Sequence, residues 1–173
     1  SGSTVTIGSD SKVEITGTLT NNGSITINST HNSFGNLIIS NISGTGTVLY
    51  KRYVAPTPAN DLIAAPLVDN TQTFAQFFTV NSNIRNNGNS ALFAPYSNAN
   101  TAYESFYSTS ASTTLEVGKG YKVGRTANST PETLTFTGTI QTVNVDVAVE
   151  ANNGNPWNLI GNPYTSAINL QDF

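Results

Sequence analysis

The stretch Trp157–Tyr164 reads WNLIGNPY, and a fainter copy of it, DLIAAPL, stands earlier in the chain at Asp61–Leu67. In both copies a polar residue precedes a Leu-Ile pair, two small or polar residues follow, and a proline ends the run. Proline has no amide hydrogen for a sheet ladder, and it constrains the residue before it to extended conformations. Each copy therefore predicts a short buried strand that stops at its proline, Pro66 in the first copy and Pro163 in the second.

The repeated unit also indicates which side chains should be internal. We expect Leu62 and Ile63 of the first copy, and Leu159 and Ile160 of the second, to pack inside an all-β body. Trp157 is the only tryptophan in the chain, and we expect it to act as a large apolar plug where the second strand begins. None of these side chains is chemically reactive, so the motif indicates an architecture and not a reaction.

The first 54 residues predict a series of short strands. Apolar residues recur in pairs two positions apart, the spacing of one face of a strand; the pairs are Val5/Ile7, Val13/Ile15, Ile25/Ile27, Leu37/Ile39 and Val48/Tyr50. Between the pairs lie turns rich in Gly, Asn and Ser, and Asn22-Gly23 is typical of a two-residue hairpin. The short, fairly even intervals also fit a small β-solenoid, which would need a cap or a neighbouring domain at its end. A meander of hairpins and a solenoid both remain open.

A proline-containing stretch, Val54–Asn60, marks the expected boundary between a first domain, residues 1–54, and a second, residues 55–173. In the second domain, Thr73–Phe78 spaces its phenylalanines at i, i+3 and i+4 and predicts one short helix. Strands are predicted in Ala91–Tyr96, Tyr103–Tyr107, Thr133–Thr139 and Val143–Val149, the last two as half-buried antiparallel strands. Leu115–Val123 predicts a turn that runs into a strand. The expected fold is all-β: a solenoid-like or meander array followed by an antiparallel β-sandwich or jelly roll.

Charged residues make up only 10% of the 173 residues and the net charge is −3, so Ser, Thr, Asn and Gly must cover most of the surface. This composition lacks the basic footprint of a protein that binds nucleic acid or an anionic membrane. It also lacks an apolar run near the ~20 residues that span a bilayer. We therefore expect no nucleic-acid partner and no membrane insertion. The absence of cysteine and methionine, with many Thr and Asn, favours an extracellular location.

The chain resembles surface proteins of Bacteroidota that are exported by the type IX secretion system. The residues that carry the resemblance are the Thr/Asn/Gly-rich array around Leu19–Ile27, the strand segment Gly46–Tyr53, the segment Asp61–Pro66, the GKGY turn Gly118–Tyr121, the FTGT strand Phe136–Thr139 and the motif Trp157–Ser166. The chain departs from the pattern at Asn60 or Asp61, where an aromatic residue is usual, and at Thr165, where a second proline is usual. The resemblance implies an adhesin or other cell-surface module, truncated at its C-terminal end, that works beside other domains of the same polypeptide.

Few residues are suited to catalysis or metal binding. His31 is the only histidine, there is no cysteine, and no serine stands in a Gly-x-Ser-x-Gly setting. The acidic residues include no pair in a setting typical of glycosidases. Asp69-Asn70 and Asp146 with Glu150 come nearest to a calcium site, and neither matches a known calcium loop. We expect no enzyme activity and no cofactor, with a structural calcium ion as the one metal considered.

Aromatic residues among Asn- and Ser-rich loops give one candidate binding face, made of Tyr96, Tyr103 and Tyr107. Aromatic rings stack on the apolar faces of sugars, and amides bond sugar hydroxyls. Core packing is the competing interpretation, since alternate residues of a strand point to opposite faces. Three functions are therefore considered: a non-enzymatic structural or adhesive module, a carbohydrate-binding module of a secreted polysaccharide-degrading enzyme, and a self-assembling filament subunit that associates through unpaired strand edges.

Overall fold

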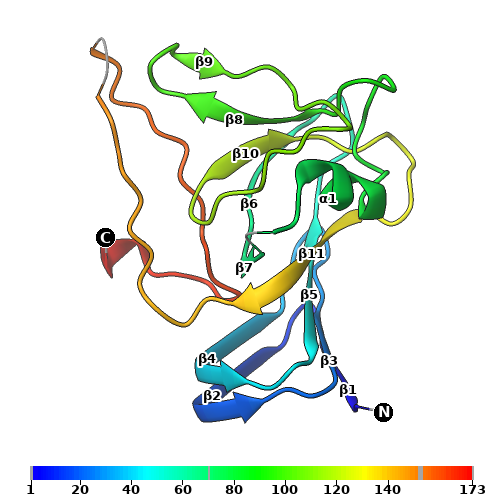
Figure 1. Ribbon diagram of the computed structural model, residues 1–173, viewed down its shortest axis with the longest axis vertical. Helices are drawn as coiled ribbons and strands as arrows, with labels where there is room; N and C mark the ends of the chain where they lie inside the picture. The colour runs from blue at the N-terminus through cyan, green and yellow to red at the C-terminus, as the bar shows by residue number, and fades with distance from the viewer. Residues whose placement is uncertain (1, 70, 152–153, 173) are drawn as a thin grey trace.

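The computed structural model describes residues 2–69, 71–151 and 154–172 (Figure 1). The strands are β1 (Thr4–Ile7), β2 (Lys12–Thr20), β3 (Ser24–Ile27), β4 (Asn36–Ser43), β5 (Thr47–Tyr53), β6 (Asp61–Ala64), β7 (Leu67–Val68), β8 (Phe93–Ser97), β9 (Ala102–Tyr103), β10 (Gly120–Val123) and β11 (Thr133–Ile140). The helices are α1 (Phe74–Val80) and a 3-10 turn, Leu170–Asp172. The all-β class is confirmed. No helix in these ranges is long and apolar enough to cross a membrane.

The N-terminal strands form a parallel β-solenoid with two faces, and not a meander. β1, β3 and β5 pair in parallel, which stacks Val5 on Ile25 and Ile25 on Val48. On the other face β2 pairs in parallel with β4, with Val13 beside Leu37. The apolar doublets therefore become stacked rows inside a coil, and the hairpin that Asn22-Gly23 suggested does not form.

A buried asparagine explains why the chain turns a corner at this point instead of folding back. Asn21 is buried, its side-chain oxygen accepts a hydrogen bond from the amide of Gly23 (3.1 Å), and its side-chain nitrogen donates to the carbonyl of Thr47 in the next coil (3.3 Å). The backbone of Asn21 also accepts from the amide of Gly46 (2.8 Å). Each coil is thus tied to the next at the corner, as expected of stacked amides in a solenoid.

The two halves of the chain share one sheet. β11 pairs antiparallel with β5 from Thr133 opposite Tyr53 to Gly138 opposite Val48, so that the sheet order is β1-β3-β5-β11-β7. Val54, at the expected boundary, is fully buried. On the other face of the solenoid, Ala167 donates its amide to the side-chain oxygen of Asn36 at the start of β4 (2.9 Å). The last coil is therefore covered by the C-terminal half, which supplies the expected cap.

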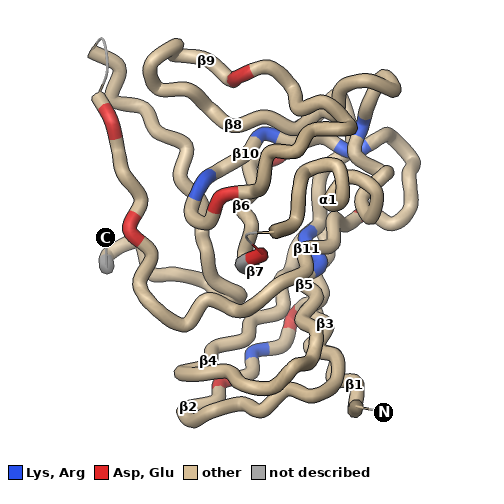
Figure 2. Tube along the Cα trace, viewed as in Figure 1, with Lys and Arg blue, Asp and Glu red and all other residues tan. Residues whose placement is uncertain are grey.

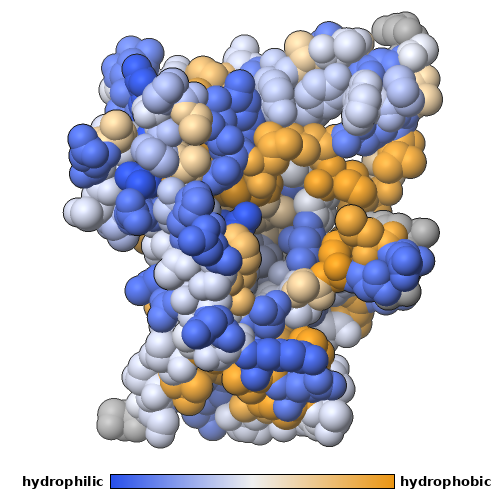
Figure 3. Space-filling view, turned by 180° about the vertical axis from the view of Figure 1, so that it is seen from behind, coloured by the Kyte–Doolittle hydropathy of each residue, from blue (hydrophilic) through white to orange (hydrophobic). Residues whose placement is uncertain are grey.

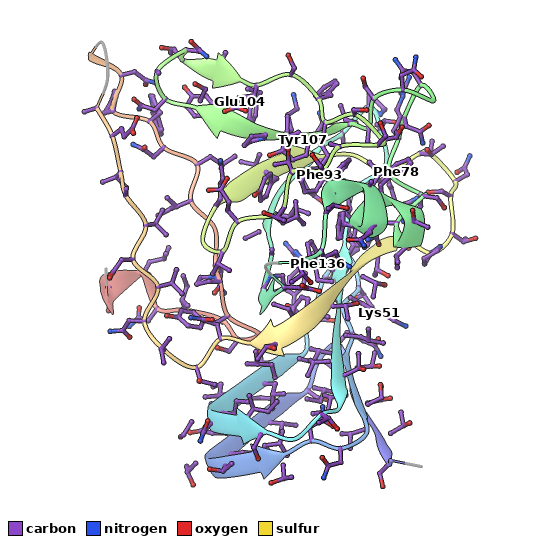
Figure 4. All side chains as sticks on the ribbon, in the orientation of Figure 1. Lys51, Phe78, Phe93, Glu104, Tyr107 and Phe136 are labelled. Carbon is purple, nitrogen blue, oxygen red and sulfur yellow. The ribbon has the colours of Figure 1, made fainter. Side chains whose placement is uncertain are left out.

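A second sheet, with the antiparallel order β6-β10-β8-β9, faces the first across an aromatic core. Phe74 and Phe77 of α1 are fully buried, and the ring of Phe77 lies 5.0 Å from that of Phe136 in β11 and 5.8 Å from that of Phe93 in β8. Figure 4 shows Phe93 and Phe136 on opposite sides of the helix. The predicted helix is confirmed, and it joins the two sheets.

Asparagine side chains complete β11 where no strand lies beside it. Asn81, just after α1, is almost fully buried; it donates to the carbonyl of Thr135 (3.0 Å) and accepts from the amide of Thr135 (2.7 Å). Asn83 donates to the carbonyls of Pro131 (2.7 Å) and Thr133 (3.1 Å). These amides take the place of strand backbone, because buried backbone groups must find partners.

The second copy of the repeated motif is not a strand, which corrects the prediction from the sequence. Within Trp157–Tyr164 the structure has a single bridge, between Ile160 and Lys119. Trp157 is 73% exposed and Ile160 is also exposed, Leu159 is half-buried, and only Pro163 is buried as expected. The segment crosses the outer face of the second sheet, where a Cβ on Gly161 would come within 2.2 Å of the Cβ of Ala64. It therefore lies over β6 and does not pair with its edge.

The first copy is a strand, but only one of its apolar pair is internal. Ile63 and Pro66 are buried, whereas Leu62 is 54% exposed and its predicted burial is wrong. Because β6 alternates, Ile63 faces the aromatic core and Leu62 faces outward. Two further predictions are corrected: Val143–Val149 is extended without any ladder, and in Tyr103–Tyr107 only Tyr103 belongs to a strand.

Candidate functional site

After β11 the chain runs outward in one extended segment and returns in another (Figure 1). We call them the first arm (residues 141–151) and the second arm (residues 154–164). Side chains and not a ladder hold them together. Asn158 donates to the carbonyl of Glu150 (2.7 Å) and accepts from the amide of Glu150 (3.0 Å). At the other end, the hydroxyl of Tyr164 donates to the carbonyl of Val143 (3.2 Å).

The second arm is fixed to the sheet by two glycines of the GKGY turn. Gly120 donates its amide to the carbonyl of Leu159 (3.0 Å), and Gly161 donates to the carbonyl of Gly118 (2.9 Å). Gly118 has a φ of +75°, which favours glycine, and a Cβ on Gly120 would lie 2.5 Å from the Cγ of Leu159. The second arm is thus hydrogen-bonded to the second sheet through the GKGY turn.

The buried amides of Asn98 and Asn155 fix the upper end of the second arm. Asn98 donates to the carbonyls of Asn155 (3.0 Å) and Trp157 (2.7 Å), and Asn155 donates back to the carbonyl of Asn98 (3.2 Å). Asn155 also donates to the hydroxyl of Tyr96 (3.2 Å). This network holds the hydroxyl of Tyr96 beside Asn155, at the start of the second arm.

Between the arms and the edge of the second sheet lies a cleft of about 440 Å³, which we call the arm cleft. Its walls carry the carboxylates of Glu104, Glu116, Asp146 and Glu150, and Lys119 is the one basic residue among the described residues that line it. Lys119 forms an ion pair with Glu116 (2.7 Å). Figure 2 shows acidic positions both on the first arm and on the sheet side that faces it. The cleft therefore has an excess of negative charge.

The arm cleft has the chemistry to bind cationic groups and hydroxyls. Carboxylates accept hydrogen bonds, and the amide of Asn158 and the phenol of Tyr96 both accept and donate. In the described parts of the chain no three His, Cys, Asp or Glu residues are grouped as metal ligands. Asp146 and Glu150 line the cleft from one arm, whereas Asp69 lies elsewhere.

Asp69, the other candidate calcium ligand, is part of a local turn. Its carboxylate accepts hydrogen bonds from the hydroxyl (2.7 Å) and amide (2.9 Å) of Thr71 and from the amide of Gln72 (3.1 Å). These bonds, that of the Thr71 hydroxyl foremost, lower the pKa of Asp69. Asn70, its expected partner, lies outside the described residues.

The three predicted sugar-binding tyrosines are divided between the surface and the core. Tyr96 and Tyr103 are cross-strand partners whose rings lie 5.5 Å apart, and the Nζ of Lys122 lies 4.9 Å from the centre of the Tyr103 ring. Tyr107 instead packs against Phe74, with the ring centres 5.1 Å apart. Figure 4 shows Tyr107 beside Phe93, while Glu104 lies farther out near β9. The strand ends after Tyr103, so Tyr107 does not share its face.

Tyr107 is half-buried and packs against the edge of the aromatic core. Burial raises the pKa of Tyr107 to about 12, and the nearby carboxylates of Glu104 and Glu116 add to the effect. Tyr121 in β10 is fully buried, and burial also raises its pKa. Its hydroxyl accepts the amide hydrogen of Glu116 (2.8 Å). These two phenols link the core to the acidic wall of the arm cleft.

The cleft residues Glu104, Glu116, Lys119 and Asn158 could not be identified as a group from the sequence. They come from a loop, a turn and the second arm, and no spacing relates them. The one local signal is the pair of acidic residues, Asp146 and Glu150, among the alternating valines of Val143–Glu150, and this pattern predicts an ordinary half-buried strand.

A second hollow, of about 410 Å³, lies between the solenoid, β6 and the second arm, and we call it the rear groove. The exposed side chains of Phe34, Leu62 and Ile160 line it, and the guanidinium of Arg52 lies 4.1 Å above the ring of Phe34. Figure 3 shows apolar surface around a hollow in the middle of this side of the molecule. The exposed Leu62 and Ile160 of the two motif copies thus meet at one groove.

Residues 1–173 match the family model described as Domain of unknown function (DUF8693). The chain belongs to this family. No curated protein and no solved structure gives a significant match.

Proposed function

We propose that this chain is a non-enzymatic structural and adhesive module of a larger bacterial surface protein, located outside the cell. The observation that carries the proposal is the connection between its two halves. β5 of the solenoid and β11 of the C-terminal half pair over six residues in one sheet, and residues 165–167 lie along β4 on the other face. A solenoid held at its end in this way is suited to serve as a stiff spacer that presents loops.

The surface and interior of the chain support this role. Charged residues make up only 10% of the sequence, so that loops rich in Ser, Thr and Asn dominate the surface. In the described residues every buried side-chain nitrogen or oxygen has a hydrogen-bond partner. An interior in which the buried polar side chains have hydrogen-bond partners resists local unfolding. Such resistance protects a protein from proteases outside the cell.

Pulling the chain from its two ends with a force probe tests the spacer role. We expect the solenoid and the C-terminal half to rupture together, because the β5–β11 ladder crosses between them. Two independent ruptures would contradict the proposal. Incubation with polysaccharides tests the absence of catalysis, and hydrolysis that Glu104→Gln or Glu116→Gln abolishes would contradict it as well.

Carbohydrate binding is the second candidate, and one specific observation favours it. Tyr96 and Tyr103 form an aromatic pair, and Tyr96 lines the arm cleft among carboxylates and amides. In a glycan array we expect any saturable binding to be lost in Tyr103→Ala and retained in Tyr107→Phe, because the Tyr107 ring stays in the core. Equal binding by wild type and Tyr103→Ala would contradict a role for this pair.

Self-assembly is the third candidate. β1 is the outermost strand of its sheet, and Val5 in it is 52% exposed although its stacking partner Ile25 is buried. An unpaired edge without charges is open to pairing with another chain. Sedimentation at rising concentration would show oligomers that Val5→Lys abolishes; a monomer at all concentrations would contradict assembly.

A further inference from the structure

The first arm has the sequence of a strand and the conformation of a strand, but it lacks a partner. Residues 143–149 alternate valine with Asn, Asp or Ala and run extended. Among the described residues, the backbone amides and carbonyls of 144–149 form no hydrogen bond with one another or with any other segment. A row of unpaired groups on an extended segment is the template on which another strand pairs.

The side chains of the first arm are also left uncovered. Val143 and Val149 are 64% and 67% exposed, and Val147 is exposed too. Val145 and Val147 lie against Gly118, which fixes the arm to the GKGY turn without covering its edge. β-Branched residues at alternate positions gain most from packing against a neighbouring strand. The arm is therefore held in place, but its backbone groups and three of its valine side chains are left exposed, where a pairing strand would cover them.

The charge of the arm cleft restricts the choice of partner. Asp146 and Glu150 are four residues apart on one face of the arm, and Glu104 and Glu116 line the opposite wall. Lys119 is the only basic residue that lines the cleft in the described chain, and it is already paired with Glu116. A second copy of the arm would bring its own Asp146 and Glu150 next to these carboxylates, and like charges in facing positions are destabilising. Basic residues on the partner would instead meet opposite charge.

We propose that the first arm captures an extended protein segment by strand addition, a segment in which β-branched residues alternate with polar ones and two Lys or Arg residues stand four positions apart. The backbone of residues 144–149 supplies the ladder hydrogen bonds, and the valines supply apolar contact. Asp146 and Glu150 select the basic residues. This role goes beyond the spacer function and does not depend on it.

A labelled eight-residue peptide tests the proposal, with valine alternating with threonine or lysine and the two lysines four positions apart. We expect a saturable rise in fluorescence anisotropy with the complete chain. The double variant Asp146→Asn, Glu150→Gln should weaken binding about tenfold, since it removes two exposed opposite-charge pairs. Hydrogen exchange at the amides of 144–149 should slow when the peptide is bound.

Two controls separate strand addition from simple attraction of cations. Val147→Pro removes an amide donor that makes no hydrogen bond within the described chain, so it should abolish binding. Val147→Ala also loses the contact with Gly118 but keeps the amide, and it should still bind. A peptide with the same two lysines, but with prolines in place of alternate valines, should not bind. Equal binding of this second peptide, or unchanged binding by Val147→Pro, would overturn the proposal.

The remaining outcomes are also decisive. Absence of binding at millimolar peptide would overturn the proposal. Tighter binding of a peptide with glutamates in place of the lysines would overturn the assignment of a basic partner. A concentration-dependent dimer that Val147→Pro abolishes would show that the occupant is a second copy of the chain.

Discussion

Thr165 closes the solenoid by a reciprocal pair of hydrogen bonds with Leu37, 128 residues earlier in the chain. Its carbonyl accepts from the amide of Leu37 (3.0 Å), and its hydroxyl donates to the carbonyl of Leu37 (2.8 Å). Thr165 is 1% exposed. One residue thus satisfies both backbone groups of Leu37 at the outer edge of β4, which a solenoid would otherwise leave to water.

Thr165→Val keeps the shape of the side chain and removes its hydroxyl donor. We expect a loss of about 1–3 kcal/mol in the free energy of unfolding, because the carbonyl of Leu37 stays buried without that partner. Urea unfolding measures the loss. Thr139→Val, at an exposed position of β11, is the matched control and should change stability by less than about 0.5 kcal/mol. Equal effects of the two substitutions would show that Thr165 is not a cap.

Phe77 connects the two sheets, so Phe77→Ala should be among the most damaging substitutions. Truncation of a fully buried phenylalanine leaves a cavity and costs about 3–5 kcal/mol. Phe106→Ala removes an exposed ring and should cost far less. Thermal unfolding of both variants checks the difference, and similar melting temperatures would disagree with the packing described here.

Asn81→Ala should destabilise the chain although Asn81 is polar. The substitution removes three hydrogen bonds, and it leaves the amide and carbonyl of Thr135 without their partner. We expect a cost of about 2–4 kcal/mol from these buried unpaired groups. Asn144→Ala, on the exposed first arm, is the control. A small effect at both positions would mean that β11 does not need the Asn81 amide.

Stability should fall in alkaline solution, and Tyr107 should contribute to the fall. Burial raises the pKa of Tyr107 to about 12 in the folded chain, whereas tyrosine in an unfolded chain has a pKa of about 10. Between these two pKa values the folded state keeps a proton that the unfolded state loses, so the free energy of unfolding decreases as pH rises. Below this window Tyr107 has no effect. Tyr107→Phe should give a shallower decrease in urea experiments; an unchanged slope would contradict the burial of this phenol.

Trp157 offers a direct optical test of the corrected motif. Because it is 73% exposed, its fluorescence in the native chain should resemble that of the unfolded chain, and acrylamide should quench it readily. Being the only tryptophan, it gives the entire tryptophan signal. A blue-shifted native emission protected from acrylamide would restore the buried plug that the sequence suggested.

The solenoid strands were predictable because their period-2 doublets depend only on which face is buried. Ile7, Ile27 and Tyr50, which are buried and stacked on one another, had to point inward in either a meander or a coil. The choice between these two depended on Asn21, whose amide bonds to the following coil. Contacts of that kind join residues that are remote in sequence, and no local pattern reveals them.

The arms show the opposite case, in which a strong local pattern was misleading. Val143–Val149 alternates as cleanly as β11, yet only β11 found a neighbouring strand, β5. In WNLIGNPY, Leu159 and Ile160 resemble Leu62 and Ile63, but Gly161 allows the segment to cross over Ala64 instead of pairing beside it. Pairing is a property of the assembled fold, so a strand pattern cannot guarantee it. For the same reason the acidic arm cleft was invisible in the sequence.

Residues 4–53 coil in parallel, and nuclear Overhauser contacts between the strands are the sharpest test of this coil. Ile25 should show contacts to both Val5 and Val48 in a parallel register, and no short Hα–Hα contacts should join β2 and β3. Short Hα–Hα contacts between Leu19 or Thr20 and Ile25, as in a hairpin at Asn22-Gly23, would contradict it.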